Sequence, residues 1–162
     1  MKMKFVHARP FVFASALLLF TLVACEKSEE NPDPTLRSKE YVLNEVNGSG
    51  AGGKITITEN ADSSFNVLVN VNNSVKDTVH ILHIHNGSIS SPGSIAIPLT
   101  PFTGTGAAAE SRTMNIKQAM LPDSSAVNLT YNGILNYTGY LNVHYSASRV
   151  DSLIAQGNIG SN

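Results

Sequence analysis

Polar and apolar residues alternate along most of the chain after about residue 38. In residues 54–59 isoleucines alternate with threonines, and in residues 65–71 a phenylalanine and three valines occupy every second position. A period of two is typical of a strand with one buried and one wet face. Further runs of strand-forming residues occur at 41–46, 79–85, 94–99, 127–131, 139–145 and 153–159. The pattern therefore predicts seven to nine short strands.

Turn-forming residues separate these runs. Glycine, asparagine, serine and proline cluster at residues 48–53, 72–74, 91–93, 104–106 and 132–133. Residues 115–121 are the exception, since they resemble a short helical turn that Pro122 would end. Short strands at this spacing favour an all-β fold, an antiparallel β-sandwich, and we expect it to occupy one domain at residues 38–162.

The first 24 residues have another pattern, that of a secretory signal. Three basic residues precede an apolar run at residues 11–23, which is short for a membrane span, and small residues follow. The run ends in Leu-Val-Ala before Cys25, which resembles the lipobox of bacterial lipoproteins. This resemblance implies that residues 1–24 are removed and that Cys25 carries lipid, enough to hold the protein on a membrane. The alternatives are an ordinary signal with an incidental cysteine and a short membrane anchor.

Cysteine content agrees with a lipid site. Cys25 is the only cysteine of the chain, so the domain has no internal disulfide and must depend on a hydrophobic core. Residues 25–37 have the composition of an acidic, proline-containing linker. Its acidic cluster directly after Cys25 resembles the signal that sorts some Gram-negative lipoproteins to the cell surface, although a solvated tether would have the same composition. The expected location is the outer membrane, at the cell surface or the periplasmic face.

Net charge excludes one class of partner. Without the three basic residues of the signal, the chain has 8 Lys and Arg and 12 Asp and Glu, so its formal net charge is −4. The chain has no Trp and no basic stripe, so nucleic acid is not an expected partner.

Histidines stand at two of the predicted strands. A period of two places His83 and His85 on one face of their strand and His80 on the other. On a later strand His144 shares a face with Asn142. The structural interpretation is that these histidines hydrogen-bond backbone or Asn142 and hold two strands in register.

Motifs around these histidines resemble the CHRD domain family, which is named after repeats in chordin and is common in secreted bacterial proteins. The shared pieces are His83-Ile84-His85 with Gly87, then Gly93, Pro98-Leu99, Tyr140-Leu141-Asn142-Val143-His144 and Gly157-Asn158-Ile159. The resemblance covers about residues 40–159. It departs at residues 153–157, where Ile154 and Gln156 replace an acidic residue and an arginine of the family. Because the animal namesake binds secreted proteins, the resemblance implies a non-catalytic binding or scaffolding module with a protein or glycan ligand.

CHRD domains in turn resemble the copper–zinc superoxide dismutase sandwich, an antiparallel Greek-key fold. In that enzyme an H-x-H strand and a later V-H strand supply copper ligands, and His83, His85 and His144 fall on the matching positions. The resemblance thus implies an alternative function, a redox or metal-handling protein that holds copper or zinc through these three histidines.

Dismutase activity itself is not expected. A fourth histidine is lacking, since His80 faces the wrong way and His7 lies in the signal. The enzyme's zinc loop and disulfide cysteines are also missing, and Arg149 is only a loose counterpart of its guiding arginine. A shared fold does not transfer function, so no catalytic residue is predicted and the protein is not expected to be an enzyme.

Overall fold

The computed structural model of the protein describes residues 36–162. The predicted signal at residues 1–24, Cys25 and nearly all of the acidic linker lie outside the described residues. Within residues 36–162, no helix is long and apolar enough to cross a membrane.

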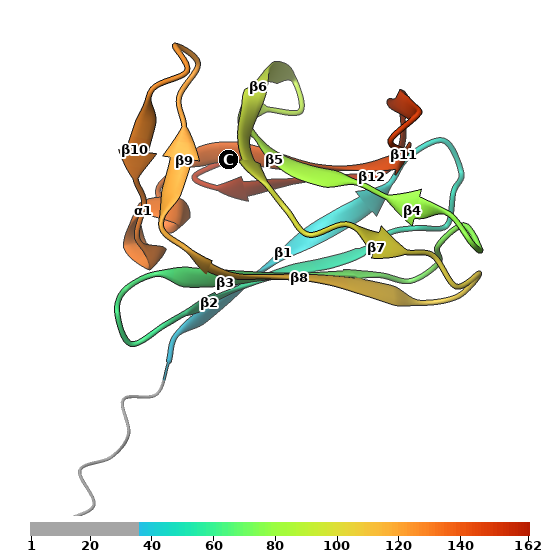
Figure 1. Ribbon diagram of the computed structural model, residues 1–162, viewed down its shortest axis with the longest axis horizontal. Helices are drawn as coiled ribbons and strands as arrows, with labels where there is room; N and C mark the ends of the chain where they lie inside the picture. Colours follow the sequence, from blue (N-terminus) through green and yellow to red (C-terminus); the bar gives the residue numbers. More distant parts are fainter. Residues whose placement is uncertain (1–35) are drawn as a thin grey trace, which may run out of the picture. The chain divides into compact units, whose positions relative to one another are not determined.

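One antiparallel sheet of eight strands dominates the fold, in the order β6-β5-β11-β12-β1-β2-β3-β8 (Figure 1). Its strands are β1 (Ser38–Glu45), β2 (Gly53–Glu59), β3 (Phe65–Val71), β5 (Leu82–Ser88), β6 (Ser91–Pro98), β8 (Ala109–Ile116), β11 (Thr138–Ser146) and β12 (Arg149–Gly160). The sheet curls so that β6-β5-β11-β12 lies over β1-β2-β3-β8, and the pairing of β1 with β12 joins the two halves. The all-β antiparallel sandwich predicted from the sequence is confirmed.

Chain crossings between the halves give Greek-key connectivity. After the β1-β2-β3 meander the chain crosses to the β5-β6 hairpin in the other half, then returns to place β8 beside β3. A strand that returns by a long connection to pair with an earlier one is the mark of a Greek key.

Smaller elements close the ends of the sandwich. A hairpin of β9 (Gln118–Met120) and β10 (Ala126–Asn128) stands beside β6, and β4 (Val79–His80) pairs with β7 (Phe102–Thr103). A single helical turn, α1 (Tyr131–Leu135), begins at Thr130, whose hydroxyl accepts a hydrogen bond from the backbone N–H of Gly133 at 3.2 Å. This contact caps the helix N-terminus.

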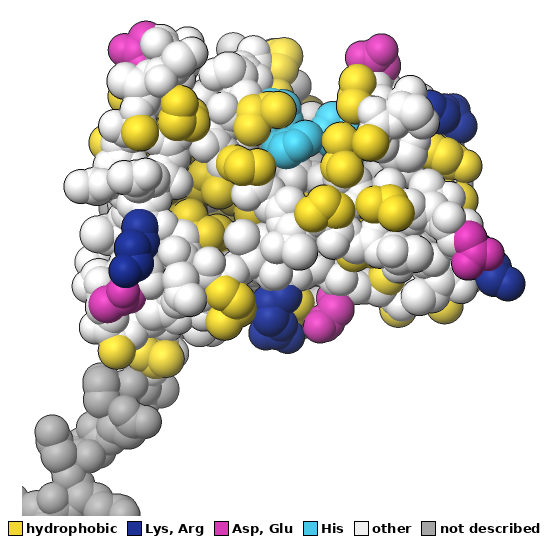
Figure 2. All heavy atoms as spheres, viewed as in Figure 1, with side chains coloured by type: hydrophobic (Ala, Val, Ile, Leu, Met, Phe, Trp, Pro, Cys, Tyr) yellow, Lys and Arg dark blue, Asp and Glu magenta, His cyan; other side chains and the backbone are white. Residues whose placement is uncertain are grey.

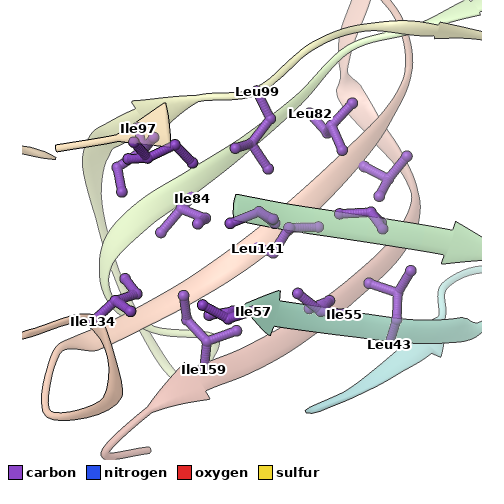
Figure 3. Packing of buried hydrophobic residues seen from close by; sticks show 14 of the residues in the cluster. Leu43, Ile55, Ile57, Leu82, Ile84, Ile97, Leu99, Ile134, Leu141 and Ile159 are labelled. Carbon is purple, nitrogen blue, oxygen red and sulfur yellow. The ribbon is translucent and has the colours of Figure 1, made fainter. Parts of the chain in front are cut away.

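Inward-facing side chains of both halves meet in one core (Figure 3). Ile55 and Ile57 of β2 face Leu82 and Ile84 of β5, and all four are fully buried. Each such side chain contributes about 1.5–3 kcal/mol when it leaves water. The alternation predicted at residues 54–59 and 65–71 is confirmed, because it is this pattern that puts every second residue into the core.

Several expectations were wrong in detail. Residues 115–121 are not a helical turn but the end of β8 followed by β9, and Asn115 near the end of β8 is in the left-handed region at φ 56°. The helical turn lies instead at α1, across the predicted turn at residues 132–133. Residues 79–85 form two strands and not one, because the strand is interrupted at Ile81, between β4 and β5. Strands β7 and β8 were not predicted, since their outer positions are largely polar and offer weak alternation.

Candidate metal centre

Two central neighbouring strands, β5 and β11, place the predicted histidines. Their antiparallel register sets His83 opposite Asn142 and His85 opposite Tyr140. Directly opposed residues of an antiparallel pair point to the same side of the sheet. The sequence-based assignment of His83 and His85 to one face is therefore confirmed, and the register adds Asn142 to that face, while the alternate residues of β5 face the core.

His144 lies two positions after Asn142 on β11 and reaches the same face. Its backbone N–H donates to the carbonyl of Ile81 at 2.9 Å, which continues the β11-β5 contact beyond β5. On the other side, the β11-β12 register shifts between Val143 and His144, where Ile154 of β12 is the extra residue. The imidazole of His144 lies next to that of His83, with 3.4 Å between Nε2 of His144 and Nδ1 of His83.

The three histidines form a cluster with the dimensions of a metal site. One ring nitrogen from each of His83, His85 and His144 lies within 4.8 Å of the other two. Two nitrogens bound to one tetrahedral ion at about 2.0–2.1 Å would stand about 3.4 Å apart. The pair of His83 and His144 already has this spacing, and a ring nitrogen of His85 lies within 4.8 Å of both.

Backbone carbonyls fix the tautomers of two of these rings. Nδ1–H of His144 donates to the carbonyl of Val150 at 2.5 Å, and Nδ1–H of His85 donates to the carbonyl of Gly93 at 3.1 Å. A carbonyl only accepts, so the proton must be on Nδ1 and the lone pair on Nε2. Metal-binding histidines in proteins are oriented by such bonds from the nitrogen that does not coordinate.

Within residues 36–162, two polar atoms at the cluster are buried without a hydrogen-bond partner. They are Nε2 of His85 and Oδ1 of Asn142. Buried lone pairs are costly to leave unsatisfied, so each points to an occupant such as a metal ion or a water. Of the two kinds of partner named in the structural interpretation, backbone or Asn142, His80, His85 and His144 use backbone carbonyls in the described residues.

Burial and repulsion from neighbouring rings lower the pKa values of His83 and His85. The pKa of His83 is lowered by burial first and then by the nearby His144 and His85. The pKa of His85 is lowered by burial, which outweighs the raising effect of its hydrogen bond with Gly93. Both rings are therefore neutral at pH 7, which is the form that coordinates a metal.

His80 belongs to the structure of the sandwich and not to the cluster. It is fully buried, its Nδ1–H donates to the carbonyl of His144 at 3.1 Å, and its Nε2 accepts from the backbone N–H of Val75 at 3.2 Å. With both ring nitrogens in use, His80 has no lone pair for a metal. The prediction that His80 lies on the face opposite to His83 and His85 is confirmed. The hydrogen bond from His80 to the carbonyl of His144 also holds the backbone of a cluster residue in place.

Other contacts of the cluster were not found from the sequence. The ring of Tyr140 stacks on that of His85 with 5.0 Å between centroids, and the Y-x-N-V-H motif was the available signal for it. The carbonyls of Gly93 and Val150 carry no sequence signal, because every residue has one. Arg149 lies over the ring of Tyr145 at 4.2 Å, in a cation–π contact.

Fold and site together define an antiparallel Greek-key sandwich with three histidines on the outer face of one half. Residues 34–150 match the CHRD domain, which is more than half of the chain. The chain therefore belongs to the CHRD domain family. This match ends before residues 153–157, where the sequence departs from the family pattern. No curated protein and no solved structure matches the chain.

Proposed function

We propose that this protein is an exported, non-catalytic binding or scaffolding module, held by lipid on Cys25 at the outer membrane, with an extracellular protein or glycan as ligand. The observation that carries the proposal is the membership of its domain in the CHRD family. The signal-like residues 1–24 and the lipobox-like sequence before Cys25 support export and anchoring.

Replacing the lipid site tests the anchor. Cys25→Ser should abolish labelling by a palmitate analogue and release the protein from the membrane fraction, since a lipid chain supplies the membrane affinity. Ser28→Ala, three residues further on, is the matched control and should retain both. Unchanged membrane fractionation of Cys25→Ser would refute lipid anchoring.

The acidic cluster makes a separate prediction about the membrane face. If Glu29 and Glu30 direct the protein to the cell surface, protease added to intact cells should digest it. The double change to Gln should then protect it. Digestion of both forms alike would show that the cluster is only a tether.

A second candidate function is the binding of copper or zinc by His83, His85 and His144. It is favoured by one observation, the buried and unpartnered Nε2 of His85 beside two further imidazole nitrogens. The cluster fits an imidazole-bound ion, which would supply Lewis-acid or redox chemistry when bound. The chain's own contribution is to hold three imidazoles close together, two of them oriented by backbone carbonyls.

Thermal unfolding with and without metal tests this candidate. A ligand that binds only the native state stabilises it by about 2.7 kcal/mol at 100 times its Kd. Copper should therefore raise the Tm of the full chain, and His83→Gln should remove most of the rise. His83 suits this test because it is half-buried and has no backbone hydrogen-bond partner through its side chain in the described residues. An unchanged Tm with copper and with zinc would leave only the structural interpretation.

A further inference from the structure

Two loops and the β11-β12 hairpin meet at one end of the sandwich. Figure 1 shows β1 and β11 ending on the right, at the end where β4 also lies. Between these elements is a cavity of about 290 Å³, which we call the end pocket. The β1-β2 loop, the β3-β4 loop, β11 and β12 all line it, with residues that include Val46, Val75, Tyr145 and Arg149. Loops at the end of a sandwich are suited to binding because the sheets fix their positions.

The walls of the end pocket are largely apolar. Val46, Val75 and Leu153 are half-buried on these walls, and Ile154 beside them is buried. An apolar group that leaves water here is stabilised in proportion to the area it buries. Ordinary ligand pockets have volumes of about 300–1,000 Å³, so the end pocket has room for one side chain and the group attached to it.

One positive charge lines the end pocket without a counter-ion. The exposed guanidinium of Arg149 lies over the ring of Tyr145, 4.2 Å from its centroid. This cation–π contact uses the face of the guanidinium and leaves the N–H donors at its edge for a ligand. Within residues 36–162 Arg149 takes part in no ion pair, and no acidic residue of this part of the chain lines the pocket. The amide of Asn47 and the hydroxyl of Ser152 line it as further donors.

Charges at a second cavity are paired. This larger hollow, of about 600 Å³, is lined by Lys54 and Glu110. Lys54 pairs with Glu40 at 2.6 Å. Glu110 pairs with Arg112 at 3.5 Å. On the face drawn in Figure 2, most Lys and Arg side chains likewise lie beside an Asp or Glu side chain. The charge of Arg149 differs from these because it is available to a ligand.

We propose that the end pocket binds the C-terminal carboxylate and the last apolar side chain of an extracellular protein. This inference rests on the proposed function above and names the part of a protein that is the ligand. The carboxylate follows from the charge of Arg149, since a guanidinium forms two parallel hydrogen bonds with a carboxylate. The apolar side chain follows from the walls, against which the hydroxyls of a glycan would lose their hydrogen bonds with water. Capture of a C-terminal carboxylate is a recurring mode of peptide recognition.

Fluorescence anisotropy with a labelled pentapeptide measures the binding. The full chain in detergent is titrated into Gly-Ser-Gly-Ser-Leu, labelled at its N-terminus, as the free acid and as the C-terminal amide. We expect the free acid to bind at least about tenfold more tightly, because only the acid presents a carboxylate to Arg149. Arg149→Gln should remove this preference. Arg149→Lys should keep part of it, since an ammonium supplies charge but not the paired hydrogen bonds.

A second arginine provides the matched control. Arg112 is also exposed but is paired with Glu110 on β8, so Arg112→Gln removes the same charge away from the end pocket. It should leave the preference for the free acid unchanged. Circular dichroism checks that the variants fold. Equal binding of acid and amide, or equal effects of Arg149→Gln and Arg112→Gln, would overturn the inference.

The last residue of the peptide tests the apolar wall. Replacing its leucine by serine should weaken binding of the free acid by about tenfold, because less apolar area is buried. Val75→Thr keeps the shape of the wall and adds a hydroxyl, so it should weaken the leucine peptide more than the serine peptide. Equal binding of the two peptides to the unaltered chain would overturn the role of the wall.

Competition with glucuronate separates a peptide from an acidic glycan. Glucuronate that displaces the free-acid peptide at equal concentration would overturn the assignment to a C-terminus. Peptide binding that persists in Arg149→Gln would overturn the end pocket but support a binding module with its site elsewhere. No binding of any probe would overturn the inference and leave the membrane anchor of the proposed function untouched, because Cys25→Ser tests that anchor in a separate assay.

Discussion

Replacing His80 by leucine is expected to destabilise the sandwich strongly, although no metal or ligand is involved. His80 is fully buried, and its ring connects two backbone groups that lie far apart in the sequence, the N–H of Val75 and the carbonyl of His144. Leucine has a similar volume and fills the space against Phe102, whose ring centroid lies 5.0 Å from that of His80. The two hydrogen bonds are lost, because leucine has no polar atom to make them.

The magnitude depends on those two groups. A buried polar group left without a partner costs about 1–3 kcal/mol. The N–H of Val75 has a single hydrogen to donate, whereas the carbonyl of His144 has a second lone pair that another donor can use. We therefore expect His80→Leu to lower the free energy of unfolding by about 2–4 kcal/mol, a large fraction of the stability of an ordinary domain.

Urea unfolding of the full chain in the presence of a chelator is the assay, so that no metal contributes. His83→Leu is the matched control, because it is the same substitution at a half-buried histidine whose ring has only the 3.4 Å contact with His144. It should change the free energy of unfolding by less than about 0.5 kcal/mol. Similar losses in both variants, or a loss below about 1 kcal/mol in His80→Leu, would refute the bridging role of His80.

Acid should destabilise the domain in two separate ranges. The pKa values of His83 and His85 are lowered in the folded chain, so the unfolded chain binds more protons, and the free energy of unfolding should be constant above about pH 6.5 and decrease as the pH falls below it. Glu40 and Glu59, whose pKa values are lowered by Lys54 and Arg37, should add a further loss only below about pH 4.5. His83→Gln should flatten the upper range in urea titrations at fixed pH, and a stability that rises from pH 7 to pH 5.5 would contradict the argument. In β12, Gly157→Ala should cost about 1–3 kcal/mol by the same measurement, because an added Cβ would overlap the carbonyl oxygen of Val42. Gly48→Asn, in open space at φ 67°, should cost less than about 0.5 kcal/mol, and equal costs would contradict the packing of β1 on β12.

The class of fold and the grouping of the histidines on their strands could be predicted from local sequence patterns. Alternation in β2 and β3 sorts core from surface without reference to any neighbour, because the period of a strand is a local property of the backbone. The same parity places His83 and His85 together and His80 apart. These features could be predicted because each depends on residues only two positions away.

Tertiary structure decided the features that depend on a neighbouring strand. Strand β8 was missed because, as an edge strand, it buries little apart from Ser111 and Ile116, so its residues do not alternate clearly. The approach of His144 to His83 requires the β5-β11 register, which has no local signal. The interruption at Ile81 and the bridging role of His80 likewise depend on the position of β4 beside β11. The hydrogen bond from His80 to His144 joins residues 64 positions apart, and no periodic sequence pattern predicts such a contact.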